Sequence, residues 1–215
     1  MQKKTYAVLG LGRYGAAVAK ELVKNGADVI AVDKNEQIVQ DSSVYLPICK
    51  CADITDPEVI SELGISNADV VIVAMASSLE GSILAITLCK EAGVKTVIAK
   101  CANETHRKIL KRVGADTVVF PENESGTRLA KNLLTSGFTD ILTLSDDLSL
   151  VELAARDEWV GKSLKELNLR KKYSVNVVAF RKNGKITAPV SPDELLDKTT
   201  ELIAIVNTSR LSKLK

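Results

Sequence analysis

Histidine is almost absent from this chain, which has a single one, His106, among 215 residues. Histidine is the side chain best suited to proton transfer near neutral pH, and it is the most common metal ligand. The four cysteines include no Cys-x-x-Cys pair, so their spacing is not that of a zinc or redox site. The sequence therefore argues against zinc chemistry and offers little material for acid–base catalysis.

Long apolar runs and a charge excess are missing as well. The longest apolar run, Val70 to Ala76, is strand-sized, whereas a membrane-spanning helix needs about 18 such residues. The 29 basic and 27 acidic residues nearly cancel, and the basic cluster Arg170-Lys171-Lys172 is short. Nucleic-acid binders and polybasic membrane anchors both need a stronger basic excess. We therefore expect a cytoplasmic protein that binds no nucleic acid.

Residues 1–120 alternate regularly between strand and helix patterns. Strands are predicted at six short apolar runs, 6–9, 29–32, 46–51, 70–74, 96–99 and 117–120. Helical spacing occurs at 16–24, 58–63, 79–92 and 104–113. Continuous apolar strands separated by helices are typical of a parallel sheet covered on both faces. The predicted fold class is therefore α/β, with a doubly wound parallel sheet of the Rossmann type.

The pattern changes at Pro121. Residues 121–138 are predicted to form a connecting helix, with Leu129, Leu133 and Leu134 as its apolar stripe. The remaining residues, 139–215, are predicted to form a small α+β domain. Its strands are expected at 141–144, 148–154, 175–180, 185–188 and 201–206, and its short helices at 163–167 and 192–196.

The glycine motif Gly10-x-Gly12-x-x-Gly15 follows the first predicted strand directly and opens the first helix. Gly10 permits a tight turn, Gly12 lets the backbone approach a diphosphate, and Gly15 lets the helix pack against the strand. The helix N-terminus then presents N–H groups and a positive dipole to the phosphates. Because strand, turn and helix occur in the required order, the motif predicts a nucleotide site.

Three charged residues extend this prediction. Asp33 ends the second predicted strand, where its carboxylate can accept hydrogen bonds from both ribose hydroxyls, unless it is only a helix cap. Asp53 follows the third strand and either faces the adenine side of the site or caps the next helix. Arg13 projects from the glycine loop and either meets a terminal phosphate or is a solvated residue at a helix start.

With these residues in place, the sequence resembles the RCK domain, the regulator-of-potassium-conductance fold. It is most similar to KtrA-like members of the KtrA/TrkA-type regulatory subunits of bacterial potassium uptake systems, because it holds one RCK unit and TrkA subunits usually hold two. The matching segments are VLGLGRYG (8–15), ADIT (52–55), SILA (82–85), IAK (98–100), GADTVVFPE (114–122), VEL (151–153), GKSL (161–164), LNLR (167–170), KYSVNVVA (172–179), Pro189 and ELI (201–203). The chain departs from the family pattern at two places. Ala52 stands where the family often has glycine, and Ser77-Ser78 stands where it often has an acidic or amide residue; both departures bear on nucleotide preference.

The resemblance implies a nucleotide-gated cytosolic regulatory subunit that binds ATP or ADP, with NAD(H) as the alternative. It carries a nucleotide-binding role over to Gly10, Gly12, Arg13, Tyr14, Gly15, Asp33, Lys34, Asp53, Lys100 and Glu122. Glu122 is further implied to hold a divalent cation, Mg²⁺ or Ca²⁺, although it could equally be a carboxylate at a helix N-terminus. Homodimers would form a ring, typically an octamer, on a membrane potassium-translocating subunit of the KtrB or TrkH type.

The second domain is implied to bind cyclic di-AMP at a two-fold dimer interface, as in several KtrA-like proteins. The residues concerned are Leu169, Arg170, Val175, Asn176, Val177 and Pro189. Arg170 can offer paired donors to a phosphate, and the aliphatic residues can cover a purine. The spacing alone leaves an alternative open, in which Val175 and Val177 belong to a dimer core and Arg170 is a solvated turn residue.

Two other classes of protein are alternatives. An NAD-dependent oxidoreductase is the main one, but the second domain is small and offers no histidine for proton transfer. A nucleotide-responsive transcription factor would need a basic DNA-reading helix, and no such segment flanks the Rossmann unit. We therefore expect a regulatory protein without catalytic residues, held at the inner face of the membrane by its partner.

Overall fold

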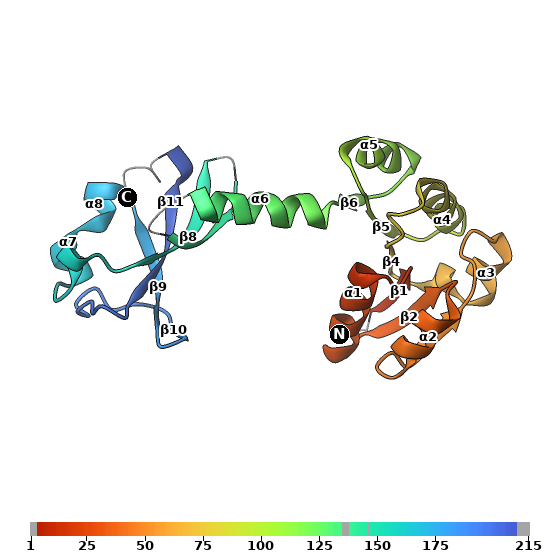
Figure 1. Cartoon of the computed structure of the whole chain (residues 1–215), viewed down its shortest axis with the longest axis horizontal. Coiled ribbons are helices and arrows are strands. Elements are labelled where there is room, and N and C mark those ends of the chain that lie inside the picture. Colours follow the sequence, from red (N-terminus) through yellow and green to blue (C-terminus); the bar gives the residue numbers. More distant parts are fainter. Residues whose placement is uncertain (1–3, 135–137, 146, 210–215) are drawn as a thin grey trace. The chain divides into compact units, whose positions relative to one another are not determined.

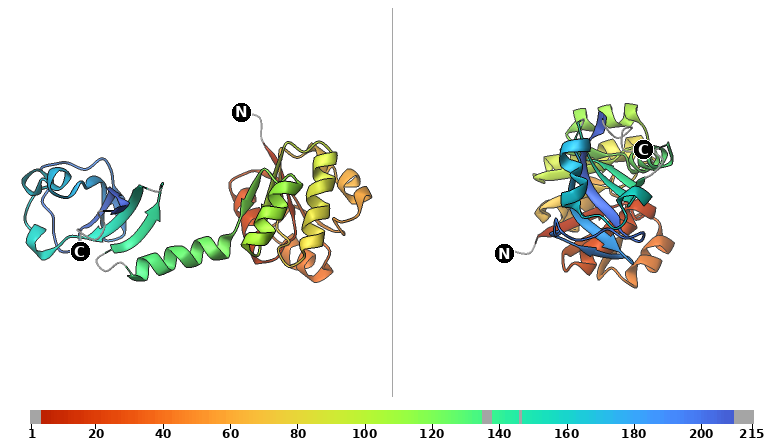
Figure 2. Two further views of the ribbon diagram at one scale, coloured as in Figure 1. Left: turned by 90° about the horizontal axis from the view of Figure 1, so that it is seen from above. Right: turned by 90° about the vertical axis from the view of Figure 1, so that its left-hand side faces the viewer.

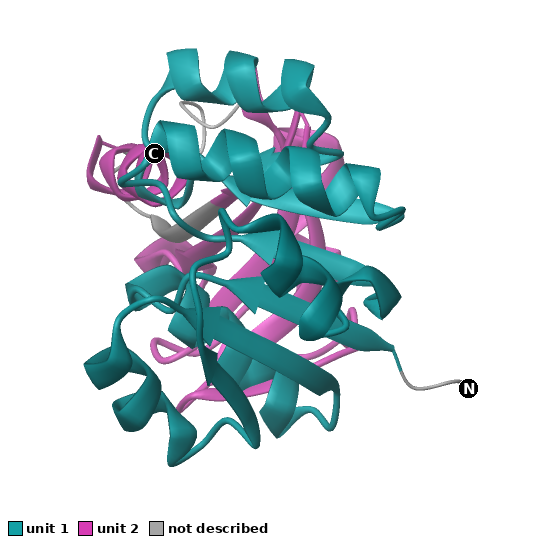
Figure 3. Cartoon of the chain, turned by 90° about the vertical axis from the view of Figure 1, so that its right-hand side faces the viewer, with its two compact units in different colours: residues 1–122 teal, residues 123–215 magenta. Residues whose placement is uncertain are grey.

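The computed structural model describes residues 4–134, 138–145 and 147–209. The chain divides into two compact units, Met1–Glu122 and Asn123–Lys215, shown in teal and magenta in Figure 3. Helix α6 (Pro121–Leu134) begins at the end of the first unit and belongs mostly to the second. The separate connecting segment at 121–138 therefore stays a prediction.

A parallel sheet of six strands forms the centre of the first unit (Figure 1). Its order is β3-β2-β1-β4-β5-β6, and every neighbouring pair is parallel. The strand order changes direction at β1, which places a ligand crevice at the carboxyl ends of β1 and β4. The predicted doubly wound fold is confirmed. The strands are β1 (Thr5–Leu9), β2 (Asp28–Asp33), β3 (Ile48–Cys51), β4 (Val70–Val73), β5 (Thr96–Lys100) and β6 (Thr117–Val119).

Apolar residues are buried on both faces of this sheet. On one face, Val71 and Val73 pack with Leu110, and on the other, Val8 and Ile72 pack with a second set of residues. Burying each such side chain contributes about 1.5–3 kcal/mol, so both helical layers are needed. The connecting helices are α1 (Arg13–Lys24), α2 (Glu36–Ser43), α3 (Pro57–Glu62), the 3-10 turn η1 (Ile65–Asn67), α4 (Leu79–Glu91) and α5 (Glu104–Val113).

Helix α2 is a helix that the apolar pattern does not predict. Within it only Ser42 is fully buried, so it lacks the apolar stripe on which the prediction of a helix depends. Its start is instead defined by the Asn35 side chain, which accepts a hydrogen bond from the backbone N–H of Ile38 at 3.2 Å.

The second unit is built on an antiparallel sheet in the order β10-β9-β11-β8-β7, whose strands can be followed in Figures 1 and 2. Its core contains Trp159, Phe180 and Leu202, so the predicted small α+β lobe is confirmed. The elements are β7 (Phe138–Thr143), β8 (Leu148–Ala154), the 3-10 turn η2 (Asp157–Trp159), α7 (Leu164–Leu167), α8 (Leu169–Tyr173), β9 (Asn176–Lys182), β10 (Lys185–Thr187) and β11 (Glu201–Asn207).

One local prediction in this unit is wrong. The short helix predicted at 192–196 is absent, and a loop lies there that pairs Leu195 with Ser163 in an isolated bridge. The basic run Arg170-Lys171-Lys172, for which a solvated turn was one of the open alternatives, lies in helix α8. The loop at 192–196 is held by contacts with Ser163 and Lys182, which lie elsewhere in the unit.

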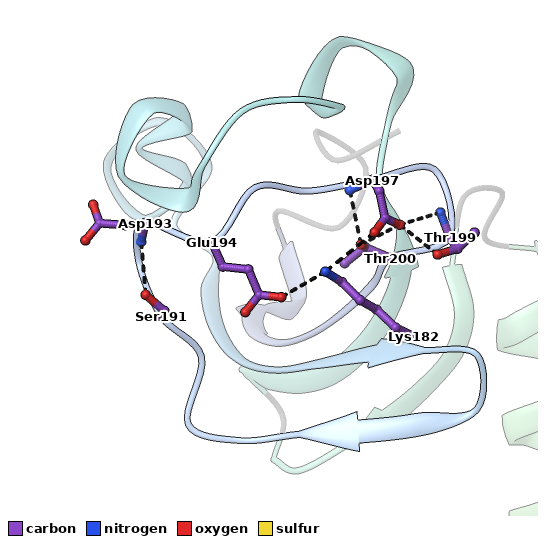
Figure 4. A network of polar contacts seen from close by, with 7 residues as sticks. All are labelled: Lys182, Ser191, Asp193, Glu194, Asp197, Thr199 and Thr200. Carbon is purple, nitrogen blue, oxygen red and sulfur yellow. Dashed lines mark hydrogen bonds and ion pairs between the residues drawn. The ribbon is translucent and has the colours of Figure 1, made fainter.

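Side-chain contacts stabilise the loop that is found where a helix was predicted at 192–196 (Figure 4). Lys182 lies 2.8 Å from Glu194 and 3.5 Å from Asp197. The hydroxyls of Thr199 and Thr200 donate to Asp197 Oδ1 at 2.7 and 3.0 Å. Hydrogen bonds from Thr199 and Thr200 lower the pKa of Asp197 to about 2, because they stabilise its charged form.

Candidate nucleotide-binding site

A cavity of about 520 Å³ lies at the carboxyl ends of the central strands of the first unit. This volume is in the range of small-molecule pockets, and its place is the topological switch point where ligands bind in doubly wound folds. Five predicted site residues line it: Gly10, Gly12, Asp33, Lys34 and Asp53. The other lining residues are Val32, Asn35, Ile38, Ala52, Ile54, Thr55, Ala74, Met75, Ser77, Ser78, Glu80, Gly81 and Leu84.

The three glycines of the motif have different surroundings. Gly10 has a φ of +95°, and a Cβ there would lie 2.7 Å from the Met75 side chain. A Cβ on Gly15 would lie 1.9 Å from the Gly10 carbonyl oxygen, so a larger residue cannot fit without moving the backbone. A Cβ on Gly12 would meet nothing within 4 Å. Gly10 therefore lies in the turn, Gly12 leaves open space for a ligand, and Gly15 allows close packing, as their spacing predicts.

Gly12 is also the N-cap of helix α1. It supplies no side-chain cap, and the first turn of α1 contains no acidic residue. A helix start without its own carboxylate presents a positive dipole and N–H groups to an outside anion. Since Gly12 lines the cavity, this end of the cavity suits a phosphate.

Asp33 is held in a defined orientation at the end of β2. Its Oδ2 accepts a hydrogen bond from the Leu11 backbone N–H at 2.6 Å, and its Oδ1 accepts one from the Asn35 N–H at 2.9 Å. A carboxylate has about four acceptor positions, so two such bonds leave room for the two hydroxyls of a ribose. Asp33 therefore ties the glycine loop to β2 and keeps acceptors for a ligand in the cavity it lines.

Asp53 does not cap a helix. The cap of α3 is Asp56, whose carboxylate accepts from the Glu58 N–H, whereas Asp53 accepts from the N–H and hydroxyl of Thr55 at 3.0 and 2.7 Å. The backbone N–H of Thr55 and then its hydroxyl hold the pKa of Asp53 below its ordinary value, and the Lys34 ammonium adds to this. Asp53 is therefore a charged acceptor on the wall of the cavity.

Apolar residues provide part of the remaining lining of the cavity. Ile38, Ile54 and Leu84 line the cavity, and the Leu84 side chain stays 41 % exposed although it lies on the helix that covers the sheet. Apolar side chains of this kind can pack against a purine ring. These three residues were not among the predicted ones. The sequence gives no signal for Ile38, because Ile38 lies on helix α2, which the apolar pattern does not predict. Leu84 lies in segment 82–85, which matches the family, but no binding role was predicted for it.

The other predicted residues of this unit, apart from Gly15, form a second cluster outside the cavity lining. Lys100, at the end of β5, places its Nζ 2.6 Å from Glu122 Oε1 and 5.7 Å from the centre of the Tyr14 ring. The hydrogen bond from Lys100 is the main cause that lowers the pKa of Glu122, and the Arg13 charge contributes. The structure thus brings Arg13, Tyr14, Lys100 and Glu122 together around an ion pair.

The donors at Glu122 do not by themselves make a metal site. Over the described residues, no group of three or more His, Cys, Asp or Glu side chains could hold a metal ion. The Glu122 carboxylate is paired with Lys100, whose positive charge opposes a neighbouring cation. A divalent cation at Glu122 therefore stays a prediction that the arrangement of this chain does not support.

The predicted cyclic-dinucleotide residues are divided between core and surface. The side chains of Leu169 and Val175 are buried in the core of the second unit, and Val177 packs against it. Arg170 on α8, Asn176 at the start of β9 and Pro189 are exposed. The exposed residues remain candidates for contact with a ligand, whereas the buried side chains serve the core of their own lobe.

Comparison with known proteins identifies the family. The TrkA-N domain model matches residues 6–121, and the TrkA-C domain model matches residues 148–215. Ktr system potassium uptake protein C of Bacillus subtilis is 35% identical over 211 residues, which cover 98% of this chain and 96% of that protein. The chain belongs to the Ktr/Trk family of potassium uptake proteins. The predicted resemblance to KtrA/TrkA-type subunits is thereby confirmed.

Other Ktr/Trk relatives agree with this assignment. Ktr system potassium uptake protein A of Bacillus subtilis is 34% identical, with 91% of this chain and 88% of that protein covered. Among solved structures, the GsuK channel matches with a TM-score of 0.71 at 18% identity, covering 99% of this chain and 39% of the longer channel chain. The structural match supports the fold. Over the described part of this Ktr/Trk protein, no helix is both long and apolar enough to cross a membrane.

Proposed function

We propose that this Ktr/Trk family member is a nucleotide-responsive regulatory subunit of a potassium uptake system and that its first unit binds an adenine mononucleotide, ATP or ADP. The observation that carries the proposal is the cavity between Gly12 and Asp53. It joins a helix N-terminus for phosphate, a carboxylate at Asp33 for ribose and apolar walls for a purine. Family membership supplies the link to potassium uptake.

A mononucleotide fits this arrangement better than NAD(H). The cavity is lined by residues that follow or end β1 to β4, and none of its lining residues comes from β5 or β6. On that side of the sheet, Lys100 is closed off by its pair with Glu122 and by the Tyr14 ring. The second half of a dinucleotide would have to displace this cluster, whereas one nucleoside with its phosphates would not.

Regulation requires a ligand that binds two states of the protein differently. Arg13 on α1 is proposed to contact the terminal phosphate bound in a neighbouring subunit, so that ATP and ADP differ in their effect. Homodimers are proposed to assemble into a ring on a separate membrane potassium-translocating subunit of the KtrB or TrkH type. The protein would then be cytoplasmic and peripheral to the membrane, with no enzymatic role.

The second unit is proposed to bind cyclic di-AMP through residues of two chains. The supporting observation is the exposure of Arg170, the second residue of α8, and of Asn176, the first residue of β9. A two-fold symmetric ligand can meet the same residues twice at an isologous interface. The buried positions Leu169 and Val175 would support this surface from within.

The test of the nucleotide proposal is calorimetric titration of the whole protein with ATP, ADP, NAD⁺ and NADH. Wild-type protein should bind ATP and ADP more tightly than NAD⁺ or NADH. Asp33→Ala should weaken ATP and ADP binding about tenfold or more, because hydrogen bonds to a charged group contribute about 1.5–3 kcal/mol each. Asp41→Ala, which removes an exposed carboxylate of α2 that does not line the cavity, is the control and should bind like wild type.

Two outcomes would contradict the proposal. One is tighter binding of NAD⁺ or NADH than of either adenine mononucleotide. The other is reduction of NAD⁺ with small alcohols or hydroxy acids above a heat-killed control, which would favour the oxidoreductase alternative.

A further inference from the structure

We infer that Glu80 selects the base of the nucleotide, because its carboxylate accepts a hydrogen bond from the exocyclic amino group of adenine and opposes the 6-oxo group of hypoxanthine. This inference rests on the proposed nucleotide site and names the residue that recognises the base. Glu80 lies on helix α4, lines the cavity and was not among the predicted site residues. Its role is therefore tested by comparing two nucleotides that differ in their base.

Two helices begin at the cavity, and their N-termini differ. Gly12, the N-cap of α1, offers no side-chain cap, and the first turn of α1 contains no acidic residue. At α4, the N-cap Ser78 accepts a hydrogen bond from the Gly81 N–H at 3.0 Å, and Glu80 lies in the first turn. All four residues line the cavity. A phosphate is therefore favoured at α1 and disfavoured at α4, where a negative charge is already present.

The α4 end of the cavity is then left for the base. The proposed site places the phosphates at Gly12 and the ribose hydroxyls at Asp33, so the base extends away from α1. Glu80 and Leu84 are four positions apart and lie on the same face of α4, and both line the cavity. This face offers an apolar side chain and a carboxylate one turn apart, which suits the face and the edge of a planar base.

The Glu80 carboxylate has room for a ligand. Glu80 is exposed, and no described residue forms a hydrogen bond or an ion pair with its side chain. The other acidic residues of the cavity lining already accept hydrogen bonds, Asp33 from two backbone N–H groups and Asp53 from Thr55. Both oxygens of Glu80 are therefore free of the described part of the chain and can accept from a base.

A carboxylate distinguishes the two purines by the group at position 6. Adenine has an amino group there, which donates, whereas hypoxanthine has a carbonyl oxygen, which accepts. Two acceptors that face each other both lose a partner, and a site built around a hydrogen bond rejects the analogue that cannot form it. An amide can either accept through its oxygen or donate through its nitrogen. The side chain of Glu80→Gln therefore suits either base.

The experiment is calorimetric titration of the whole protein with ADP and with inosine diphosphate, whose base is hypoxanthine. Wild-type protein should bind ADP about tenfold or more tightly than inosine diphosphate. Glu80→Gln should bring the two affinities to within about threefold, mainly because inosine diphosphate binds more tightly. Such a gain cannot result from a damaged fold. Glu80→Met, which has no strong acceptor, should weaken ADP binding and also reduce the ratio.

Glu58→Gln provides the matched control. Glu58 also lies in the first turn of a helix of the first unit, α3, and it is exposed, but it does not line the cavity. The same change of carboxylate to amide should leave both affinities at their wild-type values. Thermal unfolding of each variant confirms that it is folded.

The contradictory results can be told apart. Equal wild-type binding of ADP and inosine diphosphate, or an unchanged ratio in Glu80→Gln, overturns the inference and leaves the proposed function intact. An equal rise of both affinities in Glu80→Gln is one such result, and it would assign the Glu80 charge to repulsion of the phosphates. No wild-type binding of ADP or ATP, or tighter binding of GDP than of ADP, would overturn the proposed function and the inference together.

Discussion

In the first unit the candidate binding residues surround a cavity that the single chain forms by itself, whereas in the second unit they are split between core and surface. Gly10, Gly12 and Asp33 are positioned by backbone turns and hydrogen bonds to main-chain N–H groups. In the second unit, the Leu169 and Val175 side chains are buried in the core, and Arg170 is exposed to solvent. If the proposed function holds, the first unit is preorganised for its ligand, whereas the second unit needs a second copy of the chain to complete its site.

The largest effect is expected from Gly15→Ala. The new Cβ would lie 1.9 Å from the Gly10 carbonyl oxygen, so α1 must move away from β1. We expect a loss of about 1–3 kcal/mol or more of unfolding free energy, together with loss of nucleotide binding. Urea denaturation measures the first and calorimetry the second. Gly126→Ala on α6, where a Cβ meets nothing within 4 Å, is the control and should not destabilise the protein.

Gly12→Ala separates binding from folding. Nothing lies within 4 Å of the new Cβ in the protein, so stability should fall by no more than about 1 kcal/mol, the difference between glycine and alanine at an N-cap. The methyl group would, however, stand where the proposed site places a phosphate at the start of α1, and nucleotide affinity should fall about tenfold or more. Equal affinity in this variant and wild type would show that the ligand does not use the glycine loop, and the first unit would lose its claim to preorganisation.

Arg170→Ala tests the second unit. If a cyclic dinucleotide binds there, removal of the guanidinium should weaken cyclic di-AMP binding about tenfold, because charge-assisted bonds to phosphate are the strong ones. Lys171→Ala, on the same short helix and also exposed, is the matched control. Analytical ultracentrifugation at matched concentrations should show that both variants keep the wild-type oligomeric state. Wild-type binding that survives Arg170→Ala would place the ligand elsewhere.

The smallest effect is expected at the loop next to β9. The pKa of Asp197 is lowered to about 2 from an unfolded value near 3.9, so its stabilising effect is present above about pH 4 and is lost as the pH falls toward 2. The melting temperature of Asp197→Ala should therefore lie below that of wild type at neutral pH, and the difference should shrink in acid. Asp193→Ala, an exposed residue 3.7 Å from Lys165, should show a smaller, salt-sensitive change.

Sequence reasoning was most successful where local chemistry is self-contained. The strand, glycine loop and helix around Gly12 follow one another within a few residues, and the structure shows the turn, the open approach and the close packing that their spacing implies. The prediction failed at α2 and at 192–196. Polar side chains decided those segments, Asn35 by capping a helix that has no apolar stripe, and Lys182 by pairing with Glu194 across the chain.

The sequence by itself determined that the chain is a doubly wound α/β domain followed by a smaller lobe, because the period of its apolar residues dictates which elements can bury them. The sequence also determined the position of the glycine loop after the first strand and of Asp33 at the end of the second. Only the tertiary structure decided the cavity wall at Ile38 and Leu84, the burial of Val175 and the pair of Lys100 with Glu122. These depend on distances between residues far apart in the chain, and periodicity carries no information about such distances.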